Sequence, residues 1–244
     1  MIEIPDLVSV LFIFIAIVVS FIITKKSITS YRETENKQTL IFAFAALFVG
    51  LAMIFLIVEK VFAAIAYDEF LGILFGGIAT VLSGAAVASI DAFSFKMVFP
   101  KKAKIMAALS IFIISIYLAF WIWDPTKIII DPNVDPSIGG EILFGSLFGL
   151  PFQFTPTLSY FTLFPLLLLP VLVFFYYALK IRKQYPVSSK RAWGLGLGVL
   201  ALSIAYIIEL LGVDPLITAV VRILFPIASV VLYWALFKVK AKEE

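Results

Sequence analysis

Residues 39–58 read TLIFAFAALFVGLAMIFLIV, a run without a single charged side chain. A helix rises about 1.5 Å per residue, so a run of this length covers the roughly 30 Å hydrocarbon core of a bilayer. In the whole chain 63% of the residues are hydrophobic, 14% are charged, and the mean hydropathy is +1.11. Soluble domains carry about 25% charged residues. The chain is therefore predicted to be a membrane protein.

Six other runs are also mainly apolar and of similar length. Together the runs predict an all-α membrane protein, a seven-helix bundle that forms one domain over residues 1–244. The expected helices cover approximately residues 7–23, 39–58, 70–95, 105–123, 160–179, 193–211 and 216–237. The first run is expected to remain as a helix, because acidic residues precede it and Lys25 and Lys26 follow it. That is the reverse of the charge order in a secretory signal.

Basic residues predict the orientation of the bundle. Most of the 19 Lys and Arg residues fall in three connections and the tail, all on one side of a seven-helix bundle: Lys25, Lys26, Arg32, Lys37, Lys96, Lys101, Lys102, Lys104, Lys180, Arg182, Lys183, Lys190, Arg191, Lys238, Lys240 and Lys242. Since basic residues near helix ends favour the cytoplasm, we expect the N-terminus outside and the C-terminus cytoplasmic, in a multi-pass protein of the cell membrane. Attraction to anionic lipid accounts for the basic loops, so no nucleic-acid partner is expected.

One outer connection is long. Residues 124–159 separate the fourth and fifth helices, and their second half, EILFGSLFGLPFQFTPTLS, is apolar. Phe144, Phe148 and Phe152 are four residues apart and would share one side of a short helix, which the glycines and Pro151 would break. We expect a hydrophobic cap in the membrane interface. The cap either seals the outer end of the bundle or acts as a lid or entry for an apolar ligand or lipid.

The third helix carries a stripe of small residues at a constant interval of four: Gly72, Gly76, Thr80, Gly84, Ala88 and Ala92. In lipid, helices associate through close packing, and small side chains let two backbones approach. This helix is therefore expected at the centre of the bundle. The glycines at 194, 196 and 198 are a shorter version in the sixth helix. They follow no strand, so they do not predict a dinucleotide site.

Asp91 lies close to the same face as the stripe, about 7 Å inside the basic boundary at Lys96. An ionisable side chain within a membrane helix is a candidate functional group, because unpaired charge in hydrocarbon costs several kcal/mol. The alternative is a structural carboxyl that hydrogen-bonds a tyrosine, lysine or arginine on a neighbouring helix.

Residues 206–225, YIIELLGVDPLITAVVRILF, place Glu209 and Arg222 on either side of a tight turn. The two helices are antiparallel neighbours, and side chains lean toward the N-terminus of their own helix, so these two are expected to converge. They form either a structural ion pair or a site in which Arg222 binds the carboxylate or phosphate of a ligand. Glu59 and Lys60 are expected either to line the same outer vestibule or to lie solvated among lipid headgroups.

The chain contains no His and no Cys. Haem, thiolate and histidine metal sites are therefore disfavoured. Retinal is disfavoured because the seventh helix has no lysine before Lys238 that could form a Schiff base. No close carboxylate cluster of the kind that holds magnesium is apparent. We expect no cofactor and no resident metal, and an enzyme is the least favoured class.

Three functions remain. Seven helices with an outer N-terminus resemble the topology of rhodopsins, receptors and microbial seven-helix sensor regions, an analogy of architecture alone. We therefore expect a sensor or receptor-like ligand-binding module without its own output domain, working with a membrane protein partner or as a homo-oligomer. Its ligand would be a lipid or a small apolar or anionic molecule. The alternatives are an accessory or scaffold subunit of a membrane complex, and a transporter or channel with a polar path through Asp91, Glu209 and Arg222.

Overall fold

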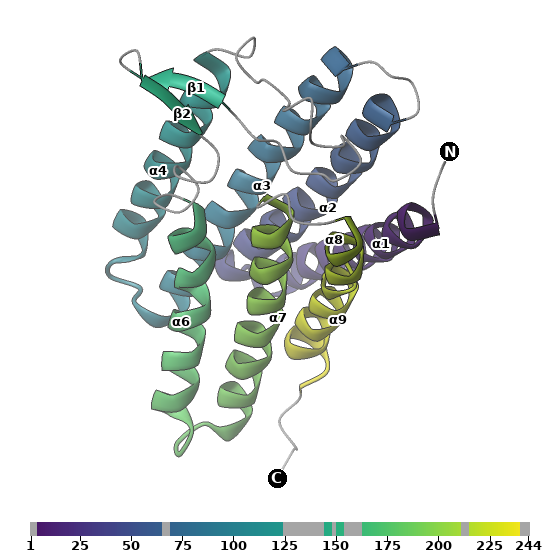
Figure 1. Cartoon of the computed structure of the whole chain (residues 1–244). Coiled ribbons are helices and arrows are strands. Elements are labelled where there is room, and N and C mark those ends of the chain that lie inside the picture. Colours follow the sequence, from purple (N-terminus) through teal and green to yellow (C-terminus); the bar gives the residue numbers. More distant parts are fainter. Residues whose placement is uncertain are drawn as a thin grey trace.

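The computed structural model describes residues 4–64, 69–123, 144–147, 150–153, 163–210 and 215–239, which contain helices and one pair of short strands (Figure 1). The helices in these ranges are α1 (Ile4–Thr34), α2 (Lys37–Ala64), α3 (Glu69–Val98), α4 (Ala103–Trp123), α6 (Leu163–Ile181), α7 (Pro186–Leu210), α8 (Pro215–Val221) and α9 (Leu224–Phe237). Strands β1 (Phe144–Leu147) and β2 (Leu150–Gln153) pair in antiparallel fashion. Each expected helix is present, the last one in two pieces.

The surface of the helices suits a lipid environment. Within the described residues, six helical stretches are long and apolar enough to cross a bilayer, and α4 contributes a shorter apolar segment, Ala103–Ile116. Large apolar side chains face outward, among them Phe14 of α1, Phe112 of α4 and Leu172 of α6. An apolar surface of this extent is stable against lipid tails and not against water. The chain is a helical membrane protein, as its composition predicted.

α1 is longer than its apolar run. The sequence predicted a helix over residues 7–23, but α1 continues to Thr34. The chain then turns at Glu35, whose φ of 52° is left-handed. Asn36 caps the following helix, because its side-chain oxygen accepts a hydrogen bond from the N–H of Gln38 at 2.9 Å. Local capping, not the end of the apolar run, therefore sets this boundary.

The last predicted helix, residues 216–237, is interrupted. The structure divides it into α8 and α9, with Arg222 and Ile223 between them. Pro226 explains the break, because proline has no N–H to donate to the carbonyl four residues earlier, and its ring crowds that carbonyl. The carbonyl of Arg222 instead accepts a hydrogen bond from the N–H of Phe225, at 3.1 Å. The predicted helix is therefore present, with a local break at Arg222 and Ile223 that the apolar pattern did not predict.

The apolar half of the long loop contains strands where a short helix was expected. Phe144 and Phe152 belong to β1 and β2, and Gly145 lies opposite Phe152 in the pair. The glycines and the proline in this stretch disfavour a helix interior, and in strands residues two apart share a face. The helical interpretation of the phenylalanine spacing is therefore wrong. Phe148, the side chains of the other two phenylalanines and most of residues 124–159 lie outside the described residues.

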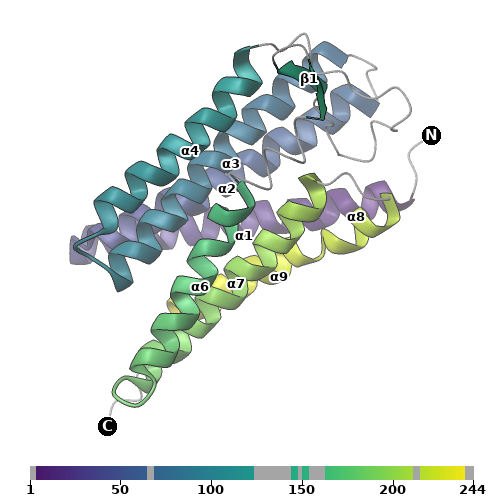
Figure 2. The same ribbon diagram turned by 60° about the vertical axis from the view of Figure 1, so that its left-hand side comes forward.

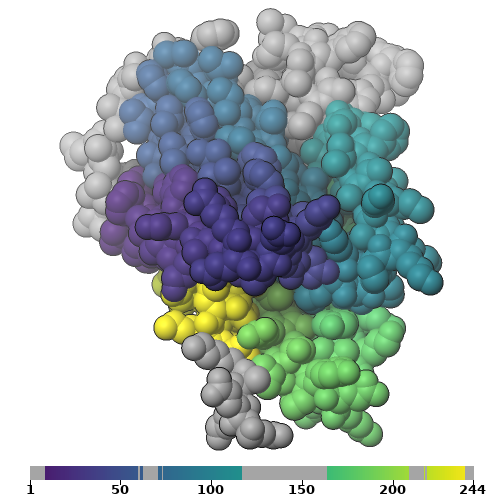
Figure 3. Space-filling model, turned by 180° about the vertical axis from the view of Figure 1, so that it is seen from behind, coloured from purple at the N-terminus to yellow at the C-terminus, as the bar shows by residue number. Residues whose placement is uncertain are grey.

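Six helices form a closed ring. α1 packs against α2, α2 against α3, α3 against α6, α6 against α7, α7 against α9, and α9 against α1. α4 lies outside this ring, against α3 and α6. Figure 2 shows the two layers that result, with α2, α3 and α4 in one, α6 to α9 in the other, and α1 behind them. From behind, α1 is seen between α2 and the yellow α9 (Figure 3).

The glycines of α7 allow its two neighbours to approach. A Cβ atom added at Gly194 would lie 2.7 Å from Cβ of Ala235 in α9, and one added at Gly198 would lie 2.6 Å from Cγ of Leu232. At distances this short a neighbouring atom would have to shift to admit a Cβ atom, so glycine is the residue that fits this packing. The glycine repeat of α7 therefore serves helix packing in the membrane.

The small-residue stripe of α3 meets more than one neighbour. Gly84 faces α4, where an added Cβ atom would lie 2.7 Å from Cγ2 of Ile114. Gly76 and Thr80, from the same stripe, line the interior of the ring. The reason is geometric, because an interval of four residues advances about 40° beyond a full helical turn. A stripe with this spacing winds around its helix and meets successive partners.

Candidate ligand-binding cavity

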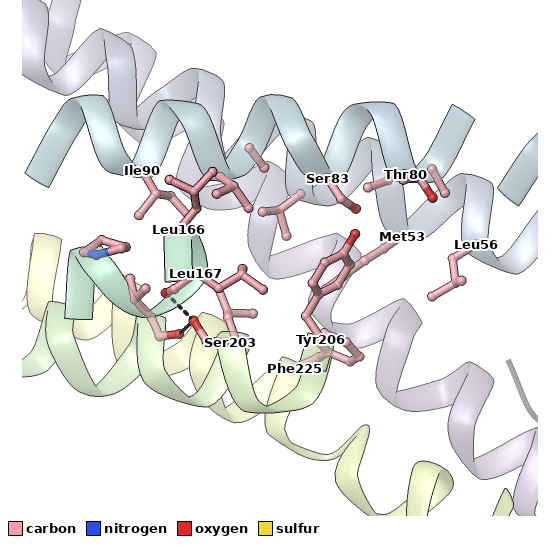
Figure 4. A pocket seen from close by; sticks show the side chains of 18 of the residues that line it. Met53, Leu56, Thr80, Ser83, Ile90, Leu166, Leu167, Ser203, Tyr206 and Phe225 are labelled. Atoms are coloured by element: carbon pink, nitrogen blue, oxygen red, sulfur yellow. Dashed lines mark hydrogen bonds between the residues drawn. The ribbon is translucent and has the colours of Figure 1, made fainter. Parts of the chain in front are cut away.

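A cavity of about 130 Å³ lies inside the ring. α2 and α3 line one side of it, and α6, α7 and α9 line the other. In Figure 4 it extends between α3 and α7, with Ile90 near one end and Leu56 near the other. Gly76 and Ile90 of α3 both line it, which gives it a length of about 21 Å along that helix.

Small side chains on α3 provide the space. Gly76, Ala79, Ser83 and Ala86 face the cavity at intervals of three and four residues, so they share one face of the helix. Ala52 of α2 adds another small side chain to the same layer. Side chains of this size leave a void that the opposing helices do not fill, and the cavity is its result.

Polar side chains gather toward one end of the cavity. We call this the polar end, and its residues are Glu59, Thr80, Ser83 and Tyr206. The Thr80 hydroxyl donates a hydrogen bond to the carbonyl of Gly76 at 3.0 Å. Figure 4 shows the ring of Tyr206 pointing from α7 toward Ser83 on α3. The Ser83 hydroxyl has no hydrogen-bond partner among the described residues.

The opposite end, which we call the apolar end, is lined by Val87, Ile90, Pro170 and Val199. A second cavity of about 20 Å³ adjoins it, shares Ile90 and Val199, and reaches Ser20 of α1. A space of that size holds about one water molecule. The main cavity therefore changes from a hydroxyl-bearing end to a hydrocarbon end along its length.

Ser203 of α7 lies between the two ends. Its Oγ atom donates a hydrogen bond to the carbonyl of Leu167 at 2.8 Å and lies 2.9 Å from the carbonyl of Val199. Leu167 lies in the turn of α6 before Pro170, where proline weakens the helical hydrogen bonds. A serine from a neighbouring helix is one way in which lipid-embedded backbone stays satisfied beside a proline. Ser203 thus joins α6 to α7 at the cavity wall.

Asp91 lies outside the cavity, in the contact between α3 and α4. Its side chain is fully buried, and its Oδ2 atom accepts a hydrogen bond from the hydroxyl of Ser110 at 2.8 Å. Its Oδ1 atom has no hydrogen-bond partner among the described residues. The partner is therefore a serine of α4 where the sequence suggested a tyrosine, lysine or arginine.

Of the predicted pair of Glu209 and Arg222, the structure describes the side chain of Arg222 alone. Arg222 is 4% exposed and lies at the break between α8 and α9. Glu209 belongs to the last turn of α7, but its side chain lies outside the described residues, as does that of Lys60. Their pairing and the shared vestibule therefore stay predictions. Glu59 lines the polar end of the cavity, whereas Arg222 is not among the described lining residues.

Sequence reasoning missed Ser83, Ser203 and Tyr206. Each is a hydroxyl-bearing residue within a long apolar helix, and such residues on a face shared with small side chains are a usable signal. Their convergence was not predictable, because it depends on which faces of α3 and α7 meet.

The fold and this cavity define a class: a helical membrane protein with an elongated, mainly apolar internal chamber and hydroxyl groups toward one end. Among the described residues, no group of three or more His, Cys, Asp and Glu side chains could hold a metal ion. Comparison with protein-family models, curated proteins and solved structures finds no match to this chain.

Proposed function

We propose that the protein is an integral membrane sensor or receptor-like module that binds an apolar small molecule in the central cavity. The cavity carries this proposal, because a mainly apolar lining with a few convergent polar groups is the usual composition of a small-molecule site. A dry cavity of about 150 Å³ in a protein core holds a molecule the size of benzene. A volume of about 130 Å³ is therefore suited to a small ring or a segment of alkyl chain.

We further propose that the N-terminus lies outside the cell membrane and the C-terminus in the cytoplasm. The basic connections support this orientation. α1 begins and α9 ends at opposite ends of the bundle (Figure 2), as an odd number of crossings requires. A ligand between the two layers would change how their cytoplasmic ends meet. A membrane protein partner or a second copy of the chain would detect that change.

Two observations favour this function over the alternatives. A transporter was predicted to use a path through Asp91, Glu209 and Arg222, but Asp91 contacts α4 and neither Asp91 nor Arg222 is among the described residues of the cavity wall. A scaffold subunit has no need of an internal chamber. Of the three functions, ligand binding by a sensor or receptor-like module is the one that uses the chamber.

Native mass spectrometry of gently extracted protein tests the proposal, with Ala79→Phe as the variant that fills the cavity. Ala79 is buried in the cavity wall, whereas Val81, two residues away, is 40% exposed on the outer face of α3. We expect a small-molecule adduct on the wild type and on Val81→Phe, and none on Ala79→Phe. An adduct that survives Ala79→Phe, or a wild type that carries no adduct and is not stabilised by any apolar compound, contradicts the proposal.

A further inference from the structure

We infer that the ligand is a single-chain amphiphile with a neutral hydroxyl head, held with its hydroxyl at the polar end and its chain toward the apolar end. This inference rests on the proposed function, and it names the ligand class and its orientation in the same cavity.

The distribution of the lining residues sets the orientation. Ser83 belongs to the polar end and Ile90 to the apolar end, and seven residues of helix separate them by about 10 Å. On the other wall, Tyr206 and Val199 have the same separation and the same order. A molecule with one polar atom and a hydrocarbon chain therefore matches the lining of the cavity in one orientation only. Reversed, it would bury its polar head among side chains that offer no hydrogen bond, at a cost of several kcal/mol in lipid.

The hydrogen-bonding capacity that remains on the hydroxyl groups of the wall determines which head group fits. The hydrogen atoms of Thr80 and Ser203 are donated to backbone carbonyls, so their oxygens are left as acceptors. The Ser83 hydroxyl has no partner among the described residues and can either donate or accept. A head that both donates and accepts a hydrogen bond matches this set, and an alcohol is the simplest such group.

Charge argues against an anionic head. The described lining residues include Glu59 and no lysine or arginine. A carboxylate or phosphate in this chamber would lose its hydration without gaining a cation. A cationic head would have to compete with the interaction that Glu59 already makes. The expectation that Arg222 binds an anionic ligand therefore does not extend to this cavity, whose described wall does not include it.

Binding of three radiolabelled ten-carbon compounds to the full chain in lipid nanodiscs tests the inference. The compounds are decanol, decanoate and decylamine, and nanodiscs with Ala79→Phe measure partition into the lipid alone. We expect saturable binding of decanol, with decanoate and decylamine at least tenfold weaker. Ser83→Ala is expected to weaken decanol about fivefold, the effect of one lost hydrogen bond.

Ser89→Ala is the matched control. Ser89 lies on α3, donates its hydroxyl to the carbonyl of Ala85 at 2.8 Å, and is not among the lining residues. We expect it to bind decanol as the wild type does. If decanoate or decylamine binds as tightly as decanol, or if Ser83→Ala and Ser89→Ala behave alike, the head-group assignment fails.

The same measurements separate this inference from the proposed function. If a charged compound binds and Ala79→Phe removes that binding, the cavity is a binding site and the inferred ligand class is wrong. If none of the compounds exceeds the Ala79→Phe background while the native adduct is lost in that variant, the inference fails alone. If none of the compounds exceeds that background and Ala79→Phe still carries the native adduct, both the inference and the proposed function fail.

Crosslinking tests the orientation. Decanol with a diazirine at its methyl end is expected to label α3 around Ile90 and α7 around Val199 after illumination, as mapped by peptide sequencing in a mass spectrometer. Labelling centred on Gly76 and Tyr206 would show the reverse orientation and overturn it.

Discussion

Replacing Gly194 by alanine measures how tightly α7 and α9 are packed. The added methyl group would lie 2.7 Å from Cβ of Ala235 and 3.1 Å from Cζ3 of Trp234. Because Cβ of alanine has no rotamer to change, α7 and α9 must separate until this distance reaches the ordinary 3.4 Å. Overpacking of this kind costs about 1–3 kcal/mol, whereas replacing glycine by alanine in a helix gains about 1 kcal/mol. We expect a net loss of up to about 2 kcal/mol.

The free energy of unfolding in mixed micelles, titrated with a denaturing detergent, provides the assay. Gly50→Ala is the control, because its added Cβ atom would be 3.4 Å from Cβ of Ser20 and in ordinary contact. That variant is expected to match the wild type or to gain up to about 1 kcal/mol. Equal stabilities of Gly194→Ala and Gly50→Ala would refute the close contact between α7 and α9.

Three further predictions concern single contacts. Pro226→Ala restores an N–H group opposite the carbonyl of Arg222, so we expect a continuous helix and slower hydrogen exchange of the amides between α8 and α9, and unchanged exchange would contradict this. Ser110→Ala removes the donor to the buried Asp91 carboxyl and is expected to cost about 1–3 kcal/mol of unfolding free energy, whereas the exposed Ser115→Ala on the same helix should cost little. Lys26→Met loses a 2.6 Å hydrogen bond to the Tyr233 hydroxyl and a cation–π contact with its ring, so a slightly lower melting temperature is expected than for Lys25→Met, and equal temperatures would show that the contact contributes nothing.

The helices could be predicted from the sequence because the bilayer fixes their length. A charge-free run such as residues 39–58 must cross lipid as a helix to satisfy its backbone. The ends of α1 and the break at Arg222 were harder to predict, because they depend on local hydrogen bonds. The cap at Asn36 and the proline at 226 were both visible in the sequence, and both could have been weighed against the apolar pattern.

The candidate site could be predicted only in part. The small residues of α3 were recognised, but they were interpreted as a packing surface alone, and Gly76 and Thr80 instead line a void. A void forms where the faces of neighbouring helices are not in contact, and its position depends on how six helices close into a ring. The Asp91 partner was missed for a related reason. The sequence does not show which face of α4 packs against α3, so it does not distinguish Ser110 from other serines as the hydrogen-bond donor.

The contact between α1 and α9 joins two helices that lie far apart in the sequence. During translation α1 enters the bilayer before α9, so one flank of α1 lacks its protein neighbour until α9 is inserted. A chain that stops before residue 224 would leave an open trough in place of a chamber. Closure of the cavity is thus coupled to insertion of α9, and products that lack α9 would leave the cavity open on that side.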